Sequence, residues 1–551
     1  MEANFYCSSS ICTIVTECSH EFESTKWEHR FDLSAKYDGI KQCHQPTIKG
    51  AEKCQYHAQI DQHDDAEVTT EQAFRSLITE SDHVLGAEFH GLTLDTIELG
   101  TEGEVVLHNV KFLDGFEIGE LISHDNITIA GSLFDRLRVD RIETTNKFDL
   151  SGNRYRGDVT IRGADTDAPI NINGNVFEKS FRLRGTFADR AQFIDSTFNE
   201  GLLFNRAQFQ GPVQCKRIEV GNDAYIHKCT FQEGLDLTDA DPDDRIFFSD
   251  SKLSSIKLGI ETASATLLLW HHTNINGGRL GQPNDKPLYY DFTRAILGDI
   301  QIPSNVPLTR YYFHETEYDG FRYANHRNTF ADENWQLHRF EVDNMERFEV
   351  EHSDLASSIT PPSIPNYSYD KELKDNEETY LLARQAATDW GDNYSASHLY
   401  LQERTARKLR HRHALQTADK LNTESTVQNA SKYFREVFHQ WTTRYGESPL
   451  QPILVSIAVI VSSWLFLLYF GRIEVSGQTR SLQTVLTSDG TNYLSYLGDT
   501  LHFSIVTFAP IGYNNYAPVG SLTNALVIIE SFTGAFLIAL FVFTLGRQVA
   551  R

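Results

Sequence analysis

The residues best suited to do chemistry lie in a short loop between two long apolar segments. The loop is Pro510-Ile511-Gly512-Tyr513-Asn514, and the segments span residues 453–470 and 522–546. Each segment is long enough to cross the roughly 30 Å hydrocarbon core of a bilayer as a helix. Pro510 and Gly512 prevent the stretch between them from forming one continuous helix, and such backbone is tolerated at membrane depth only where protein buries it or where it lines water. A span, a short loop of this kind and a second span therefore predict a pore.

A second group of candidate ligands lies near the N-terminus, where cysteine and histidine residues gather. The cysteines are Cys7, Cys12, Cys18, Cys43 and Cys54, and the neighbouring histidines are His20, His29, His44 and His57. In a cytoplasmic domain this clustering favours a metal site over disulfides. We expect a structural zinc ion on Cys43, Cys54 and His57, because zinc takes four tetrahedral sulfur or nitrogen ligands. Cys18 is the expected fourth ligand, with Cys7, Cys12 and His20 as its rivals, and a set of free thiols and surface histidines is the alternative.

The loop and its flanking segments resemble the pore region of the two-transmembrane potassium-channel superfamily. In that family a pore helix ending in Thr leads into Thr-Val-Gly-Tyr-Gly-Asp, with a Pro a few residues later. On this chain the pore helix corresponds to residues 496–509, and Asn515 and Pro518 fall where the family has Asp and Pro. The resemblance implies an ion selectivity filter made by Thr507, Pro510, Ile511, Gly512, Tyr513 and Asn514. It also implies an inner helix with Glu530 near its start, a gating hinge at Gly534 and Arg547 just past its end.

Two filter positions depart from the family pattern. Pro510 stands where the family has a Thr whose hydroxyl adds a binding ring, and proline has no hydroxyl to offer. Asn514 replaces the last Gly of the motif, which needs a positive φ, and asparagine tolerates that conformation better than most residues. We therefore expect a cation pore that uses the carbonyls of residues 511–513, with K⁺ or another monovalent cation as the permeant ion. One loop cannot surround an ion, so the pore requires a homotetramer, and the alternative is a membrane-tethered β-helix scaffold without conduction.

A long repeat fills residues 85–300. Large apolar residues recur in steps of 21 or 22 positions, at Phe112, Phe134, Tyr155, Phe177 and Phe198 and, after a break, at Phe231, Leu253 and Ile275. Small residues such as Ser132, Asn153 and Asn175 stand two positions before these anchors, so both side chains share one face of a strand. A period near twenty predicts stacked coils. The repeat resembles a degenerate pentapeptide-repeat β-helix, and the Cys/His segment resembles the small knuckles that precede such domains in archaeal proteins. An ordinary parallel β-helix is the alternative.

Composition narrows the remaining possibilities. The chain has 551 residues and a net charge of −25, which suits several domains with an acidic, solvated surface, as in the high-salt cytoplasm of a halophilic archaeon. This charge argues against nucleic acid as a partner. The paired His271 and His272 and the acidic run at 239–244 are expected to be solvated surface groups. The sequence contains no phosphate-binding loop, dinucleotide-binding glycine pattern or serine elbow, so we expect that the protein is not an enzyme.

Together these features predict a multidomain membrane protein. We expect a zinc-knuckle-like segment at 1–60, a right-handed β-helix at 85–300, an aromatic cap and Pro-rich linker at 301–365, an α-helical linker with an amphipathic cuff helix at 366–448, and a two-helix transmembrane pore domain with a re-entrant loop at 449–551. Basic residues concentrate before the first apolar segment and after the second, which predicts that both termini of this multi-pass cell-membrane protein are cytoplasmic. The expected partners are membrane lipid, further copies of the chain, and a ligand or protein that binds the β-helix and gates the pore.

Overall fold

The computed structural model describes most of the chain between residues 69 and 549. Its gaps in that range are residues 81–82, 102, 244, 261–265, 282–287, 305–306, 338–368, 418–422, 488–492, 510–511 and 513–514. Before residue 69 it describes only two antiparallel strand pairs, β1 (Phe5–Tyr6) with β2 (Thr13–Ile14) and β3 (Glu21–Glu23) with β4 (Ile40–Gln42). The expected zinc ligands Cys18, Cys43, Cys54 and His57 lie outside the described residues, as do the filter positions Pro510, Ile511, Tyr513 and Asn514.

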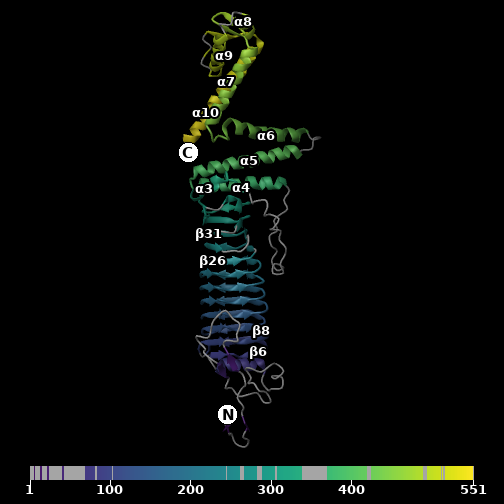
Figure 1. Ribbon diagram of the computed structural model, residues 1–551, viewed down its shortest axis with the longest axis vertical. Helices are drawn as coiled ribbons and strands as arrows, with labels where there is room; N and C mark the ends of the chain where they lie inside the picture. The colour runs from purple at the N-terminus through teal and green to yellow at the C-terminus, as the bar shows by residue number, and fades with distance from the viewer. Residues whose placement is uncertain are drawn as a thin grey trace. The chain divides into compact units, whose positions relative to one another are not determined.

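The chain divides into two compact units. The first comprises Met1–Asn366 with Gln385–Trp390, and the second comprises Tyr367–Arg384 with Gly391–Arg551. In the first unit, 31 strands pair in parallel as one sheet that winds into a β-solenoid over residues 83–318, and its rungs are visible from β6 to β31 in Figure 1. The stacked coils that the sequence predicts are therefore confirmed.

Most strands of the solenoid are short, because the chain changes direction several times in each coil. They are β5 (His83–Leu85), β6 (Glu88–Leu99), β7 (Val105–His108), β8 (Lys111–Ser123), β9 (Ile127–Ala130), β10 (Leu133–Phe134), β11 (Leu137–Thr144), β12 (Phe148–Ser151), β13 (Arg154–Tyr155), β14 (Val159–Thr166), β15 (Ile170–Asn171), β16 (Val176–Phe177), β17 (Phe181–Phe187), β18 (Ala191–Gln192), β19 (Thr197–Phe198), β20 (Leu202–Asn205), β21 (Gln208–Phe209), β22 (Val213–Gln214), β23 (Glu219–Val220), β24 (Ala224–His227), β25 (Thr230–Phe231), β26 (Leu235–Pro242), β27 (Arg245–Ser249), β28 (Lys252–Leu253), β29 (Ile256–Ile260), β30 (Thr266–His271), β31 (Asn274–Arg279), β32 (Leu288–Asp291), β33 (Ile296–Gln301), β34 (Tyr311–Tyr312) and β35 (Glu317–Tyr318).

The apolar anchors form columns inside the solenoid. The first column pairs Phe112, Phe134, Tyr155, Phe177 and Phe198 in register, and all five side chains are buried. Their rings stack on one another, with centroids 4.7 Å apart between Phe112 and Phe134 and 4.8 Å apart between Phe177 and Phe198. The sheet spacing of about 4.8 Å brings the rings into this contact, so each coil extends the same aromatic stack.

A second column explains the break in the repeat. Phe187, Phe209, Phe231, Leu253 and Ile275 pair in register along a different line of the sheet. In the first column, the partner that follows Phe198 is Val220. The series that looks interrupted in the sequence is thus two columns on two faces of the coil.

A ladder of small polar residues runs beside the first column. Ser132 Oγ accepts a hydrogen bond from Val110 N at 3.0 Å, and Asn153 Oδ1 accepts one from Ser132 N at 2.8 Å. Asn175 Oδ1 accepts the next from Asn153 N, at 2.8 Å. These side chains are buried, so the ladder satisfies backbone N–H groups at the turn, where the sheet does not pair them.

Both ends of the solenoid are closed. At the N-terminal end, Phe74 of helix α2 (Thr70–Glu80) packs edge-on against Phe89 with centroids 5.2 Å apart. Thr69 and Gln72 form a capping box at the start of this helix, because each side chain accepts a hydrogen bond from the backbone N–H of the other. At the other end lie η2 (Leu308–Arg310), η3 (Tyr323–His326) and α3 (Arg327–Asp332), with buried Phe313, Phe321, Phe330 and Trp335.

The expectation that His271 is a surface group is wrong. His271 ends β30 and is 4% exposed, and its Nε2 lies 2.9 Å from Oδ2 of the buried Asp291. Burial alone would raise the pKa of Asp291, but the charge of His271 and hydrogen bonds from Thr293 hold that pKa below its usual value. His272, by contrast, is exposed at the corner after the strand, with φ of +52°.

The second unit contains the helices that follow the solenoid. They are α4 (Tyr369–Asp389), whose last turn belongs to the first unit, α5 (Asn393–Thr417), α6 (Thr423–Thr443), α7 (Leu450–Phe470), α8 (Leu482–Thr487), α9 (Tyr493–Phe508) and α10 (Ser521–Val549). Strands β36 (Ile473–Val475), β37 (Gln478–Arg480) and β38 (Tyr516–Pro518) form a small antiparallel sheet. Helices α7 and α10 are long and apolar enough to cross a membrane, which agrees with the two predicted spans.

Candidate functional site

The predicted pore loop follows α9 in the chain, and α9 packs against α7 and α10. Leu467 of α7, Phe503 of α9 and Val527 of α10 form one buried cluster with Ile473. Polar contacts also join α7 to α9, because Trp464 Nε1 donates to Thr500 Oγ1 at 3.2 Å. Helix α9 ends at Phe508, so its C-terminal carbonyls lie at the start of the loop. The negative end of a helix dipole is a suitable neighbour for a cation.

The described part of the loop has the backbone that the motif requires. Gly512 has φ of +104°, a conformation that glycine adopts and other residues avoid. Thr507 is fully buried, and its Oγ1 has no hydrogen-bond partner within the described chain. The other four filter positions fall in the gaps at 510–511 and 513–514.

The segment after the loop is held by a network that the sequence analysis missed. Strand β38 pairs with β36, which follows α7, so the chain on the far side of Gly512 is tied to the first spanning helix. Tyr516 Oη donates to Asp499 Oδ1 at 3.2 Å, and Arg480 Nη1 donates to Asp499 Oδ2 at 2.5 Å. The three side chains come from β38, α9 and β37, and no short-range pattern links them.

Glu530 joins α10 to α9 inside the helix bundle. The carboxyl group is 1% exposed, and its Oε1 lies 2.5 Å from the Ser504 hydroxyl. The same hydroxyl lies 3.1 Å from the Ile460 carbonyl oxygen of α7, so one serine contacts both spanning helices. An ionisable group at this depth is costly unless its polar atoms are satisfied, and such a group is often functional.

Gly534 lies where α10 crosses the end of α9. A Cβ atom at this position would come within 2.0 Å of the Phe508 carbonyl oxygen. One turn earlier, Ser531 Oγ donates to the Thr507 carbonyl at 3.2 Å. The last carbonyls of α9 therefore rest on α10, which gives Gly534 a packing reason to be glycine. The hinge role stays a prediction.

Comparisons with known proteins bear on this region. A family model described as an ion channel matches residues 454–551, from the first turns of α7 through α9, Gly512 and α10. No curated protein and no solved structure matches the chain. The match and the two spanning helices support an ion channel of the potassium-channel-like kind, located in a membrane. They also favour a protein that is not an enzyme and that assembles as an oligomer among lipids.

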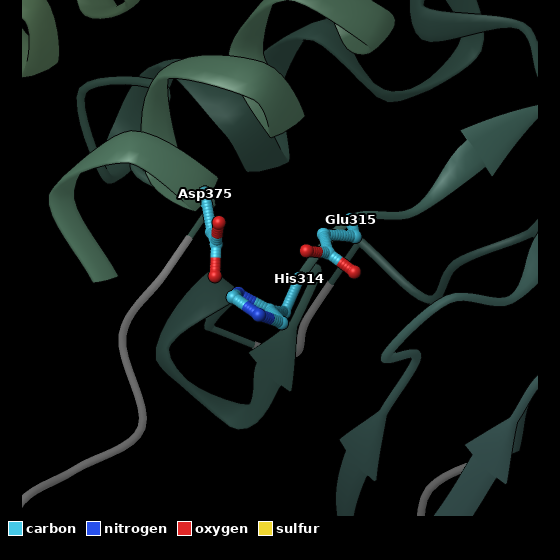
Figure 2. Close-up of side chains that lie close together, drawn as sticks. All are labelled: His314, Glu315 and Asp375. Carbon is cyan, nitrogen blue, oxygen red and sulfur yellow. The ribbon is translucent and has the colours of Figure 1, made fainter. Parts of the chain in front are cut away.

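One further set of possible ligand side chains in the first unit was not expected from the sequence. It comprises His314 and Glu315, which lie between β34 and β35 (Figure 2). His314 is buried, with its ring stacked on Tyr312 at 5.7 Å, and Glu315 forms an ion pair with Arg294. These contacts give both side chains of the first unit a structural role. The set shares no residue with the predicted zinc site.

Proposed function

We propose that four copies of this chain form a cation channel whose filter is made by Thr507 and residues 510–514. The observation that carries the proposal is the order of elements within the matched region: a spanning helix, a half-helix that ends at a glycine loop, and a second spanning helix. The positive φ of Gly512 supports a loop whose carbonyl oxygens turn toward an ion. One such loop offers a single arc of oxygens, so the site is complete only when copies meet on an axis.

In this proposal each element near the loop has a part in conduction. The peptide oxygens of residues 511–513 replace the water of a K⁺ or similar monovalent ion. Ser531 and Gly534 seat the end of α9, and Asp499, Arg480 and Tyr516 hold the segment beyond the filter. Glu530 and Ser504 fix the depth of α9 against α10.

Gating is proposed to act through the end of α10. Arg547 Nη1 donates to the Tyr445 carbonyl at 3.3 Å, and its Nη2 lies 3.0 Å from Glu447 Oε1. The same guanidinium lies over the Tyr400 ring, 5.5 Å from its centroid. A movement of α5 or α6 would therefore pull on the pore-lining helix. A ligand or protein bound to the solenoid is the proposed source of that movement, with both termini on the cytoplasmic side.

The domain boundaries and the zinc site also remain proposals. The boundaries are 1–60, 85–300, 301–365, 366–448 and 449–551. A structural zinc on Cys18, Cys43, Cys54 and His57 would brace the N-terminal segment. Metal analysis of the purified protein and of a Cys54→Ser variant tests it, with one zinc per chain expected in the first and none in the second.

The channel proposal is tested by recording from purified protein in lipid bilayers, with K⁺ on one side and Na⁺ on the other. We expect single-channel steps. The reversal potential measures the ion preference of a filter that contains Pro510 and Asn514. Gly512→Ala should abolish the steps, because a Cβ at φ of +104° costs about 1–3 kcal/mol and turns the loop. The matched control is Gly498→Ala, on the exposed side of α9 with open space around it, which should conduct normally.

Two results would contradict the proposal. The first is the absence of steps from well-assembled protein, which would leave a membrane-tethered scaffold as the function. The second is an equal effect of the Gly512 and Gly498 substitutions, which would disconnect conduction from the glycine loop.

A further inference from the structure

The second unit contains a cavity at the end of its spanning helices that ion conduction does not use. The cavity has a volume of about 270 Å³ and lies between α5, the second half of α6, the turn at Tyr445 and Gly446, and the last turns of α10. Its walls differ in character: α5 and α6 contribute charged side chains, whereas α10 contributes Leu540 and Phe543. A ligand that fills it must therefore be polar at one side and apolar at the other.

The polar wall carries an excess of positive charge. Arg435 and His439 lie four residues apart on α6 and so share one face of the helix. Both are exposed, and Arg435 makes no ion pair within the described part of the chain. Glu436 is the acidic residue of this wall, but it is 2% exposed and its Oε1 lies 3.7 Å from Arg404 Nη1. The carboxylate is thus neutralised within the wall, and Arg435 remains to bind an anion.

The apolar wall and the aromatic residues of α6 point to a lipid. Leu540 and Phe543 belong to the spanning helix α10, and Phe543 is 61% exposed. On α6, Phe434, Phe438 and Trp441 are 67%, 48% and 69% exposed, and α7 begins nine residues after Trp441. Large exposed aromatic residues next to a span are typical of the boundary between water and hydrocarbon. The cavity therefore lies at the depth where lipid head groups lie.

We propose that this cavity binds the head group of an anionic lipid. The phosphate would accept hydrogen bonds from the Arg435 guanidinium and the His439 ring, since a guanidinium matches two phosphate oxygens at once. The acyl chains would lie along Leu540 and Phe543. A soluble phosphate has the same charge but nothing to place on this apolar wall, which is why the lipid is the favoured source.

The site also touches the residues that hold the end of α10. Tyr400, Tyr445 and Gly446 line the cavity and contact Arg547, and a Cβ at Gly446 would come within 2.8 Å of Arg547 Nη1. A bound head group would fix this wall and so bias the position of α10. This last step rests on the proposed channel function, whereas binding itself does not.

The test measures binding without any need for conduction. Full-length protein in detergent is titrated with phosphatidylglycerol, and bound lipid is counted by native mass spectrometry. We expect saturable binding that falls about fivefold when Arg435→Gln removes one cation, and further in the double variant with His439→Gln. The matched control is Lys432→Gln, which removes a cation from an exposed position of α6 outside the cavity and should bind as the wild type does.

Other outcomes would overturn the proposal. An equal loss in Lys432→Gln would mean that the lipid is attracted by general surface charge. Equal binding of phosphatidylcholine would remove the need for an anionic head group, and full displacement by inorganic phosphate would make the site one for a soluble anion. A separate recording compares channel opening in bilayers with and without phosphatidylglycerol. If binding holds but no current appears in either bilayer, the channel proposal fails and the lipid site stands.

Discussion

At the scale of single residues, the contact between Gly534 and Phe508 is the most sensitive point near the predicted filter. The atom that a Cβ would meet is a backbone oxygen at 2.0 Å, which cannot rotate away as a flexible side chain could. A Cβ atom at residue 534 therefore fits only if α9 and α10 move apart. Because Phe508 lies between Thr507 and Pro510 of the predicted filter, such a shift would reach the ion path directly.

We predict that Gly534→Ala lowers single-channel conductance or changes the reversal potential. Overpacking of this kind costs about 1–3 kcal/mol, so the thermal unfolding midpoint should also fall. Gly546→Ala is the matched control, since it lies on the same helix with open space around it and should be neutral or slightly stabilising. A variant with normal conductance and an altered open probability would instead favour the hinge role.

At the scale of elements, the Ser/Asn ladder connects neighbouring coils of the solenoid. Asn153 accepts from Ser132 N through Oδ1 and donates through Nδ2 to the Ile129 carbonyl at 2.9 Å. Asn153→Ala would leave a buried N–H and a buried carbonyl without these partners. An unsatisfied buried group costs about 1–3 kcal/mol, so we predict a lower unfolding midpoint for the strand signal in circular dichroism.

The exposed Asn199 provides the control for this prediction. It occupies the same solenoid and has a solvent-facing side chain, so Asn199→Ala should leave the midpoint within experimental error. Equal shifts for Asn153→Ala and Asn199→Ala would show that the ladder adds nothing to the strands themselves.

The sequence predicts the solenoid well because the same pattern of large apolar residues is repeated in every coil. Stacked coils require the same residue size at the same place in each turn, so the anchors at Phe112, Phe134 and Tyr155 reveal the period. The change of column after Phe198 was not predictable, because both faces of the coil use the same step. Helix α2 had a signal that could have been recognised, the Thr69 and Gln72 capping box.

The candidate site likewise has features that the sequence predicts and features that it does not. The two spans and the half-helix follow from local hydrophobicity and backbone preference, and sequence reasoning anticipated them. The Arg480–Asp499–Tyr516 network and the Gly534–Phe508 contact join residues that are 17 to 26 positions apart, on different elements. Such contacts depend on how helices pack, which composition and spacing do not specify.

At the scale of the whole molecule, the contacts described above near the predicted filter belong to the second unit. The α7, α9 and α10 cluster, the β36–β38 sheet and the Arg547 contacts use residues from 400 onward. The solenoid belongs to the first unit. We propose that the solenoid acts in opening the pore and not in choosing the ion.

We predict that a chain lacking residues 1–366 still conducts, with the reversal potential and conductance of the full chain but a different open probability. The deletion keeps α4 to α10 and every contact named near the filter. The measurement is paired single-channel recording of both forms in the same lipid. Arg547→Gln, made in the full chain, should shift open probability in a similar way, because it removes the bonds to Tyr445 and Glu447 that transmit movement to α10. Unchanged opening in the shortened chain would leave the solenoid without a gating role, while a changed reversal potential would mean that the first unit influences the filter.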